Sequence, residues 1–400
     1  MNRWVATGVL GAVVTLHNAQ RLAPVPLLTE FCQRLNVDYV GAGNLFGAFL
    51  FGTAVANIPV GILADRHGSK GLITAGAALG LVLSAIFALT QNYWIALAAR
   101  FGLGAAGSLL FVPTLRYIVS SFPKETRGSA MGYIQVGSGM GMVFSLTILP
   151  LLSARFDLTK TFLVLPALAT IILVLVVFGL RTARPASKPV VWQQIGDLAR
   201  CRPFWHLSAF HFLTMLSVYA VLGWLPTFLR LDFEYSATQA GIISALVNVA
   251  FAFFSPMAGH ASDRLGTRTP IMIIGSLLSM GCFAVFIAGD HPVMILVAVV
   301  LMGLSMALTI PLSQVLVGET FSGIGSGLAV SATNTAGRIA ASLPGMFGGF
   351  ILQASGTFAA VWGLALLFGG ARIPFLIAVR EGRATGRDEP VSQAISDKTM

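Results

Sequence analysis

The chain has 400 residues, of which 56% are hydrophobic and only 10% are charged. Because a soluble domain carries about 25% charged residues, this composition excludes an ordinary water-soluble protein and indicates that most of the chain lies in a lipid bilayer. The net charge of +10 does not indicate a nucleic-acid partner, since the basic residues gather in loops, where they set orientation in a membrane. The three cysteines have no metal-binding spacing, so we expect neither a bound metal nor a disulfide framework.

Twelve apolar segments follow one another along the chain, and each is long enough to cross a hydrocarbon core of about 30 Å as a helix. They cover 4–27, 41–62, 72–90, 94–118, 128–151 and 159–180 in the first half, and 205–228, 237–258, 270–288, 292–317, 325–350 and 357–378 in the second. The sequence therefore predicts an all-α membrane protein with twelve transmembrane helices.

The longest connection between these segments is basic and contains Pro185 and Pro189, which interrupt a helix. The expected domains are an N-terminal six-helix bundle (1–180), a cytoplasmic basic linker (181–204), a C-terminal six-helix bundle (205–380) and a polar cytoplasmic tail (381–400). With both termini inside, sixteen Lys and Arg residues lie on the cytoplasmic side and four lie outside. This asymmetry predicts a multi-pass protein of the cell membrane with both termini in the cytoplasm.

A short charged turn occurs once in each half, at 61–70 and at 259–268. The offset of 259 − 61 = 198 residues is about half the chain. Five positions agree in type between the copies: Gly61/Gly259, Asp65/Asp263, Arg66/Arg264, Gly68/Gly266 and Lys70/Arg268. Two copies between apolar helices indicate an internal duplication, as in many transporter folds.

Three further motifs accompany this repeat. Arg100 to Gly104 reads Arg-x-x-x-Gly in the fourth segment, Phe122 to Gly128 reads Phe-Pro-x-x-x-Arg-Gly before the fifth, and Trp224 begins Trp-Leu-Pro in the seventh. With the repeated turn and the basic linker, they give the chain a resemblance to the major facilitator superfamily over nearly its whole length. The resemblance implies two pseudo-symmetric six-helix bundles built from inverted repeats, which rock about a cavity lined by segments 1, 4, 7 and 10.

The resemblance also implies that the repeated turn latches the two halves together at the cytoplasmic face when the cavity faces outward. We expect Arg116 to pair with Asp65, because the family places the second and fourth segments near each other at that face. The alternative is a plain loop that only sets orientation. The expected gating and latch residues are Gly61, Asp65, Arg66, Gly68, Lys70, Arg116, Arg127, Gly259, Asp263, Arg264, Gly266 and Arg268.

Glycines in the fourth and fifth segments predict helices that pack closely through small residues. They are Gly102, Gly104 and Gly107 in the fourth segment and Gly128, Gly132, Gly137, Gly139 and Gly141 in the fifth.

The charges inside the segments indicate the kind of solute. All fifteen Asp and Glu lie in loops, at segment ends or in the tail, whereas Arg21, Arg100, Arg116, Arg338 and Arg372 lie inside segments. A cation in hydrocarbon is costly unless it faces a wet cavity or a partner. With no buried acid available, a solute anion is an attractive partner, although we expect Arg116 to be structural and Arg372 to be peripheral.

Arg338 is the strongest candidate for binding that anion. Ser331, Asn334 and Thr335 share one helix face with it, on an otherwise apolar segment. This face either forms hydrogen bonds to neighbouring helices or lines a cavity in which the guanidinium binds carboxylate-like oxygens.

The first segment offers His17 and Arg21, four residues apart on one face. Arg21 followed by Pro24 and Pro26 is similar to the arrangement in the superfamily's anion:cation symporters, and the fifth segment lacks the Gly-Pro-x-x-Gly-Gly signature of drug/proton antiporters. Arg21 could instead reach out to the membrane interface, and His17 could be structural. The remaining candidates are Gln135, His211, Tyr219 and Trp224, with Asn248 and Gln314 as weaker ones.

These features predict a secondary active or facilitative transporter that moves a small anionic solute, a carboxylate or an inorganic anion, by alternating access. We find no Walker motif and no nucleophile–base set, so we expect neither an enzyme nor a cofactor. A multidrug-type exporter of amphipathic compounds and a transport-inactive sensor or scaffold of the same fold are the alternatives. We expect a monomer in the bilayer; a coupling proton, a counter-anion and uniport stay open.

Overall fold

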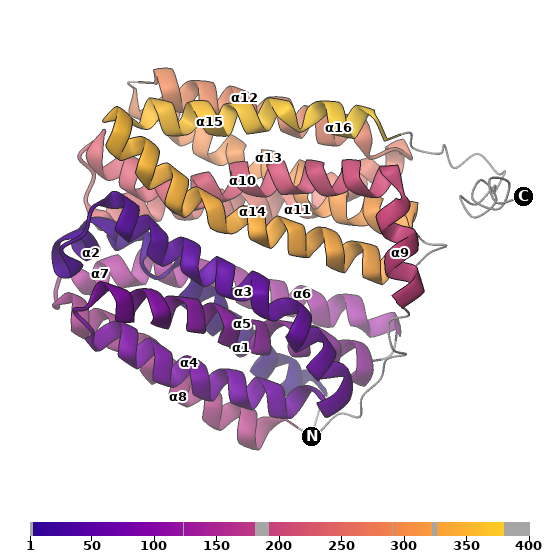
Figure 1. The fold of residues 1–400 in the computed structure, drawn as a ribbon, viewed down its shortest axis with the longest axis horizontal. Coiled ribbons are helices and arrows are strands. Elements are labelled where there is room, and N and C mark those ends of the chain that lie inside the picture. The colour runs from indigo at the N-terminus through magenta and orange to yellow at the C-terminus, as the bar shows by residue number, and fades with distance from the viewer. Residues whose placement is uncertain (1–2, 123, 181–191, 290, 322–325, 380–400) are drawn as a thin grey trace, which may run out of the picture. The chain divides into compact units, whose positions relative to one another are not determined.

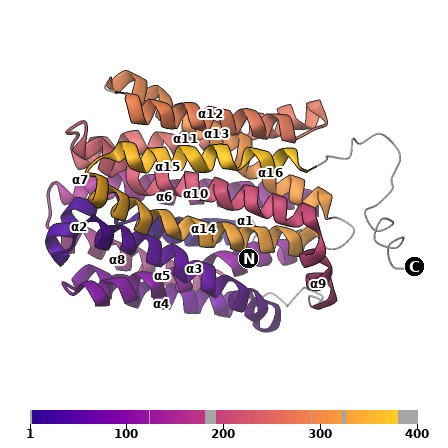
Figure 2. The ribbon, with the colours of Figure 1, turned by 45° about the horizontal axis from the view of Figure 1, so that its top comes forward.

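The computed structural model describes residues 3–122, 124–180, 192–289, 291–321 and 326–379, and these are helical almost throughout (Figures 1 and 2). The first half contains α1 (Arg3–Leu22), the 3-10 turn η1 (Val25–Leu27), α2 (Leu28–Leu35), α3 (Tyr39–His67), α4 (Ser69–Leu89), α5 (Tyr93–Ser121), α6 (Lys124–Val143), the π-helical turn η2 (Phe144–Ile148), α7 (Leu149–Ser153) and α8 (Leu158–Gly179). The second half contains α9 (Trp192–Arg200), α10 (Arg202–Leu231), α11 (Ala237–Leu265), α12 (Thr269–Ala288), α13 (Pro292–Thr320), α14 (Ser326–Ser355), α15 (Phe358–Ala371) and α16 (Ile373–Ile377). The predicted all-α fold is confirmed.

Every predicted segment coincides with a helix, or with a helix and its continuation across a short break. In the described part of the chain, ten helices are long and apolar enough to cross a membrane. The other two long helices, α1 and α14, carry polar residues such as Asn18, Arg21, Asn334 and Arg338 within apolar sequence, which lowers their mean hydropathy. The polar residues that weaken the signal of a membrane span are therefore those of the candidate site.

The repeated charged turn is mostly helical, so the expected ten-residue turn is wrong. Helix α3 continues to His67, α4 begins at Ser69, and the chain reverses at Gly68, whose φ is 76°. In the second copy α11 continues to Leu265, and Gly266 has a φ of 65°. Only glycine adopts this region without a Cβ penalty, so these two glycines make the reversals and the acidic residues sit on the last helical turn.

The chain divides by packing into two compact units. The first unit combines 1–188, 219–248 and 341–361, and the second combines 189–218, 249–340 and 362–400. Helices α10, α11, α14 and α15 therefore contribute residues to both units. The division expected from the repeat, into 1–180 and 205–380, stays a prediction.

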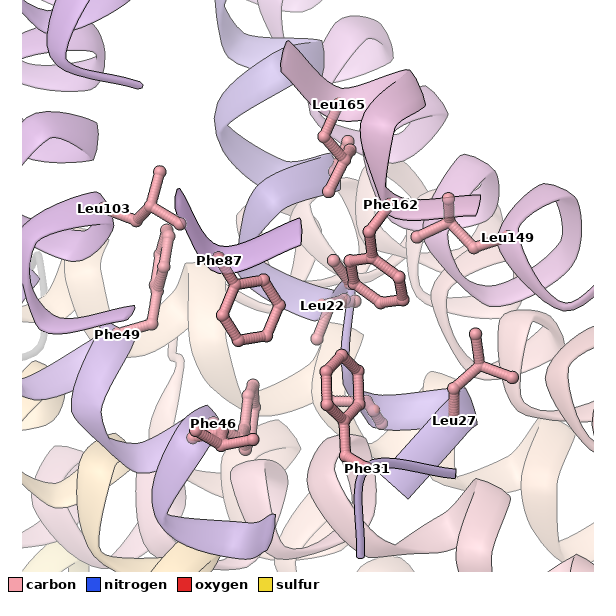
Figure 3. Close-up of a cluster of buried hydrophobic side chains, with 14 of the residues drawn as sticks. Leu22, Leu27, Phe31, Phe46, Phe49, Phe87, Leu103, Leu149, Phe162 and Leu165 are labelled. Atoms are coloured by element: carbon pink, nitrogen blue, oxygen red, sulfur yellow. The ribbon is translucent and has the colours of Figure 1, made fainter. Parts of the chain in front are cut away.

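A buried aromatic cluster holds the connection between α1 and α3 in the first unit. The ring of Phe31 on α2 lies 5.2 Å from that of Phe87 on α4 and 5.0 Å from that of Phe162 on α8, centroid to centroid. Figure 3 shows the three rings packed together, with Leu22 and Leu27 beside them. Fully buried aromatic rings of this kind are major contributors to packing energy, so the short helix α2 is fixed against α4 and α8, which also pack on each other.

Helix packing in both units uses the same contact at equivalent positions. A Cβ atom on Gly76 of α4 would lie 2.8 Å from Cβ of Leu109 on α5, and one on Gly275 of α12 would lie 2.7 Å from Cβ of Leu308 on α13. The two offsets are equal, 275 − 76 = 199 and 308 − 109 = 199. The packing of α4 on α5 and of α12 on α13 therefore supports the duplication that the charged turns indicate.

Glycines bring α5 and α6 to backbone distance from their neighbours. A Cβ atom on Gly104 would overlap the carbonyl oxygen of Phe49 on α3, and one on Gly141 would overlap the carbonyl oxygen of Thr15 on α1. A Cβ on Gly137 would lie 2.5 Å from the carbonyl oxygen of Gly11. These contacts confirm the predicted close packing.

The other predicted glycines behave differently. Gly102 and Gly107 meet the side chains of Leu83 and His17, whereas Gly132 and Gly139 have no atom within 4 Å of a built Cβ, so the prediction is wrong for those two. The surroundings of Gly128 lie outside the described residues.

A π-helical turn interrupts the fifth predicted segment, which was expected to be one helix over 128–151. Pro150 has no N–H and cannot bond to the carbonyl of Leu146, four residues earlier. A Cβ on Gly241 at the start of α11 would overlap that freed carbonyl oxygen. The break therefore allows the start of α11 to pack closely on the π-helical turn within the first unit.

The predicted linker holds a helix that the sequence did not indicate, α9. Its predicted helix-interrupting prolines, Pro185 and Pro189, and the tail 381–400 lie outside the described residues.

We expect Gly104→Ala to destabilise the protein, because the added methyl group would overlap the carbonyl oxygen of Phe49 and force α5 away from α3. Overpacking of this kind costs about 1–3 kcal/mol, which thermal unfolding in detergent would register as a lower midpoint. Gly132→Ala is the matched control, since its Cβ position is open and alanine is favoured over glycine in a helix by about 1 kcal/mol. A Gly104→Ala midpoint equal to or above that of Gly132→Ala would contradict the backbone contact.

Candidate functional site

The C-terminal end of α1 is held by an arginine from another helix. The last carbonyls of a helix have no intrahelical partner, and here Pro24 supplies no N–H to the carbonyl of Gln20. Arg100 of α5 donates to the carbonyl oxygens of Gln20 at 2.6 Å, of Arg21 at 2.9 Å and of Leu45 on α3 at 2.9 Å. A cation at the negative end of a helix dipole is also favoured, so Arg100 joins α1, α3 and α5.

The guanidinium of Arg100 is enclosed by aromatic rings. Its Cζ atom lies 4.7 Å from the ring centroid of Phe49 and 5.5 Å from that of Phe87, two rings of the cluster in Figure 3. The side chain is 1% exposed. Backbone carbonyls and aromatic faces compensate this buried charge, so Arg100 needs no solute anion as its partner.

Arg372 also has a protein partner, which corrects the expectation that it is peripheral. It is 1% exposed and donates to the hydroxyl of Ser279 on α12 at 2.6 Å. Its Cζ atom lies 5.9 Å from the ring of Phe210. The premise that buried arginines in this chain await an anion is therefore wrong for Arg100, whereas Arg372 has one hydroxyl acceptor and a buried Nε without a hydrogen-bond partner.

Arg21, in the last turn of α1, differs from Arg100. It is 8% exposed, its Nη1 donates to the hydroxyl of Tyr219 at 3.4 Å, and its Nε is buried without a hydrogen-bond partner. Within the described residues, no carboxylate forms an ion pair with it. Its burial argues against the alternative in which it reaches the membrane interface.

Tyr219 is the residue of the second half that is equivalent to Arg21 in the first half. The offset 219 − 21 = 198 equals the spacing of the charged turns, so equivalent residues of α1 and α10 are in contact. The Tyr219 ring also stacks on Phe46 of α3, with centroids 6.2 Å apart. The repeat offset was therefore a feature of the sequence from which this contact could have been predicted.

His17 lies on α1 one turn before Arg21 and is packed among rings. It is 2% exposed, and its ring centroid lies 5.7 Å from that of Phe49 and 5.9 Å from that of Phe111. Gly107 leaves the space that the imidazole fills, since a Cβ there would overlap Nδ1. The packing fits the structural alternative for His17.

The second unit contains a hydrogen-bonded group of polar side chains from α10, α13 and α14. His211 lies 3.2 Å from Ser313 and 3.4 Å from Gln314, and Gln314 exchanges two hydrogen bonds with Asn334 at 2.7 and 2.8 Å. Arg338, half-buried, follows Asn334 by one helical turn. The structure therefore brings His211 and Asn334 together through Gln314, which the sequence marked only as a weak candidate.

The other predicted binding residues have separate surroundings. Trp224 is 1% exposed and its indole N–H donates to the carbonyl of Pro344 at 2.8 Å, so its polar atom is already used in packing. Gln135 is exposed on α6. Asn248 is 7% exposed, and its Nδ2 is buried without a partner.

The second copy of the repeated turn forms a charged cluster. Arg268 donates to both carboxylate oxygens of Glu319 at 2.8 and 2.7 Å, to Ser262 at 2.8 Å and to Asp263 at 3.2 Å. The hydrogen bonds to Glu319 raise the pKa of Arg268 above its usual value, with Asp263 adding to the effect. Arg268 thus connects the ends of α11 and α13. The sequence did not indicate Glu319 as its main acceptor.

The first copy is described only in part. Lys70 donates to the carbonyl of Val177 on α8 at 2.8 Å, and Arg116 is half-buried on α5. The side chains of Asp65, Arg66 and Arg127 lie outside the described residues, so the expected pairing of Arg116 with Asp65 stays a prediction. Gly61 and Gly259 have open space around a built Cβ, and Arg264 is exposed.

An ion pair that the sequence did not indicate joins α10 to α2. Arg230 lies 2.7 Å from Glu30, with side chains that are 18% and 31% exposed, and it also donates to the carbonyl of Pro26 at 3.3 Å. Both residues lie in connections between predicted segments.

Comparison with known proteins decides the family. The profile of the Major Facilitator Superfamily matches residues 10–236 and 207–397. The chain belongs to this superfamily. It is therefore a multi-pass membrane protein of a superfamily of transporters.

Individual relatives are distant. The chain is 25% identical over 285 residues, 64% of its length, to "Probable anion transporter 3, chloroplastic" from Oryza sativa subsp. japonica, and covers 55% of that protein. It is 24% identical over 160 residues, 40% of its length, to "Probable sugar efflux transporter" from Helicobacter pylori strain P12, and covers 41% of it. The matches thus span about half the length of these curated relatives.

Solved structures share the fold. A bacterial homologue of the human lysosomal transporter Spinster, crystallised in an inward-facing and unoccupied conformation, matches with a TM-score of 0.77 at 14% sequence identity. The match covers 94% of this chain and 95% of the other. At this identity the likeness concerns the fold alone, and it agrees with the twelve helices expected from the sequence.

We expect Arg100→Lys to destabilise the protein, because one ammonium group cannot reach all three carbonyls that the guanidinium fork serves. Leaving a buried acceptor without a donor costs about 1–3 kcal/mol, measured as a lower thermal midpoint in detergent. Arg155→Lys, at an exposed arginine of the first unit, should stay within about 0.5 kcal/mol of wild type. Equal midpoints for the two variants would contradict the role of Arg100 at the end of α1.

A double-mutant cycle on Arg268 and Glu319 should give a favourable coupling energy. Two hydrogen bonds link the groups, but Glu319 is 54% exposed, so solvent screening limits the coupling to about 1 kcal/mol. The same cycle on Lys160 and Asp157, a more exposed pair at 3.1 Å, should give a smaller coupling. Unfolding in detergent measures both, and the reverse order would contradict a cluster at the ends of α11 and α13.

Proposed function

We propose that this transporter carries a small anionic solute, a carboxylate or an inorganic anion, across the cell membrane by alternating access. The observation that carries the proposal is the environment of Arg21. This cation lies inside the first unit with a phenol hydroxyl as its hydrogen-bond partner and with its Nε unpaired.

The contrast with Arg100 supports this proposal. Arg100 uses all three of its nitrogens on backbone carbonyls, whereas Arg372 donates to Ser279 and, like Arg21, has a buried Nε without a hydrogen-bond partner. A guanidinium has five N–H donors, and the hydroxyl of Tyr219 accepts only one of those of Arg21. A carboxylate or phosphate-like anion accepts two parallel hydrogen bonds from such a fork, and it would neutralise the charge that Tyr219 leaves uncompensated.

The same charge argues against the alternatives. An amphipathic cation would be repelled by Arg21 and Arg338, and no described span carries a carboxylate away from its ends to attract one. The relatives' names include both an anion transporter and a sugar efflux transporter. A neutral sugar could accept hydrogen bonds from Arg21 but would leave its charge buried, which is costly in a membrane protein, so we favour the anion.

The remaining parts of the proposal follow from this one. We place both termini in the cytoplasm and assign Arg338 and Asn334 to the wall of the solute pathway in the second unit. The bundles 1–180 and 205–380 would rock against each other, with the clusters around Lys70 and Arg268 acting as latches. The transporter would work as a monomer.

Uptake into proteoliposomes tests the function. We expect the purified protein to transport at least one of phosphate, sulfate, succinate and gluconate, and to transport neither tetraphenylphosphonium nor xylose. Arg21→Gln should lower that uptake by about tenfold or more, since a charge-assisted hydrogen bond contributes about 1.5–3 kcal/mol. Arg155→Gln removes an equal charge from an exposed site and should transport like wild type.

Three results would contradict the proposal. Uptake of tetraphenylphosphonium alone would favour a drug exporter, uptake of xylose alone would favour a sugar carrier, and no flux would favour a sensor or scaffold. Anion uptake by Arg21→Gln at the wild-type rate would remove Arg21 from the binding site, and the same result for Arg338→Ala would remove Arg338.

A further inference from the structure

We propose that His211 binds a proton that is coupled to transport, and that Gln314 relays its protonation to Asn334 on the helix that carries Arg338. The coupling rests on the transport function proposed above, whereas the proton site and the relay rest on side-chain geometry in the second unit.

The hydroxyl of Ser313 sets the tautomer of the neutral imidazole. Ser313 donates its own hydrogen to the carbonyl of Ile310 at 2.8 Å, so its oxygen is an acceptor toward Nδ1 of His211 at 3.2 Å. Nδ1 therefore carries the hydrogen, and in the neutral ring Nε2 is an acceptor. The amide nitrogen of Gln314 lies 3.4 Å from Nε2 and donates to it.

The amide of Gln314 is also paired at its other edge. Its Nε2 donates to Oδ1 of Asn334 at 2.7 Å, and its Oε1 accepts from Nδ2 of Asn334 at 2.8 Å. The orientation of one amide thus fixes that of the other. Ile310, Ser313, His211, Gln314 and Asn334 form one continuous chain of hydrogen bonds that is consistent only with a neutral ring.

Protonation reverses the requirement at one end of this chain. A proton on Nε2 places an N–H opposite the N–H groups of Gln314, so two donors face each other across 3.4 Å. Rotation of the Gln314 amide by half a turn brings Oε1 to Nε2 and restores the bond. The paired edge survives only if the Asn334 amide also rotates, and its oxygen and nitrogen then exchange places. One proton at His211 therefore exchanges donor for acceptor on α14.

The ring of His211 lies in a closely packed, buried site. His211 is 2% exposed, and Gly337 of α14 makes room for it, since a Cβ there would lie 2.6 Å from the ring. The charged residues on or near the helices that contact the ring are Arg338, next to Gly337, Glu319, which already holds Arg268, and Arg372, which donates to Ser279. His17, the other fully buried histidine of the described residues, packs among aromatic rings.

The negative charge of the solute would couple its binding to protonation of His211. An anion near Arg338 and a proton on His211 attract each other, and by linkage each then increases the affinity for the other. A chain without carboxylates in the middle of its spans can in this way couple anion movement to proton movement.

Nuclear magnetic resonance of ¹⁵N-labelled protein in lipid nanodiscs tests the site without knowledge of the solute. We expect the His211 resonances to show the Nδ1–H tautomer at high pH and to change to those of the doubly protonated ring as the pH falls, in the presence of phosphate or succinate. The side-chain amide resonances of Gln314 and Asn334 should shift with the same midpoint. His211→Gln assigns the ring signals and should abolish the amide shifts.

Two variants separate the relay from a general change of structure. In Gln314→Met the ring should still titrate, but the Asn334 amide should stop following it. His206→Gln, at a half-buried histidine on the same helix outside the relay, should leave both signals as in wild type. A ring that keeps one tautomer over the whole pH range, or an Asn334 amide that still follows it in Gln314→Met, would overturn the proposal.

Transport gives the second readout. At a one-to-one stoichiometry, a gradient of one pH unit sustains up to about tenfold accumulation of the anion, and His206→Gln should retain this. His211→Gln should lose it. Accumulation by His211→Gln as in wild type would overturn the coupling while leaving the anion transport proposed above intact, and absence of anion transport in wild type would overturn the transport proposal while the resonance titration still decided the relay.

Discussion

The bond between Arg100 and the end of α1 is the constraint on which the first unit depends. In a bilayer every backbone polar group must find its partner within the protein, and Pro24 removes the N–H that the carbonyl of Gln20 would otherwise use. Arg100 supplies that partner together with those for Arg21 and Leu45. The same bonds fix the backbone from which the Arg21 side chain extends. The candidate binding cation is therefore positioned by a second arginine whose own charge is already compensated.

Buried polar side chains in this protein differ in how many of their donors and acceptors have hydrogen-bond partners. Arg100 has a backbone carbonyl for each of its three nitrogens and acts as a structural tie, whereas Arg372 donates to one hydroxyl and has a buried Nε without a partner. Arg21 has one weak acceptor and an unpaired Nε. The His211 chain is satisfied, but only in one protonation state. Incomplete or conditional satisfaction of a buried charge is costly in lipid, and a transporter can use that cost to bind a solute or an ion.

The internal duplication explains both the likeness and the difference between the halves. Gly76 meets Leu109 as Gly275 meets Leu308, because small residues are needed wherever two helices approach closely. At the equivalent positions 21 and 219, however, one copy has arginine and the other tyrosine, and the two side chains contact each other. A repeated scaffold with unlike residues at one equivalent pair thus places a cation and a hydroxyl together, which neither half contains alone.

The sequence by itself determined the long apolar helices, the family and the set of polar residues, because each depends on local pattern: apolar length, glycine in the reversals and charge near the helix ends. Gly68 and Gly266 were readable in this way. It did not determine which arginines are already paired. The bonded partners are far apart in the sequence, as in Arg100 with Gln20, Arg372 with Ser279, and His211 with Gln314. Only tertiary packing decides which donor meets which acceptor. Arg21, Arg100 and Arg372, which look alike in the sequence, therefore have different surroundings in the folded protein.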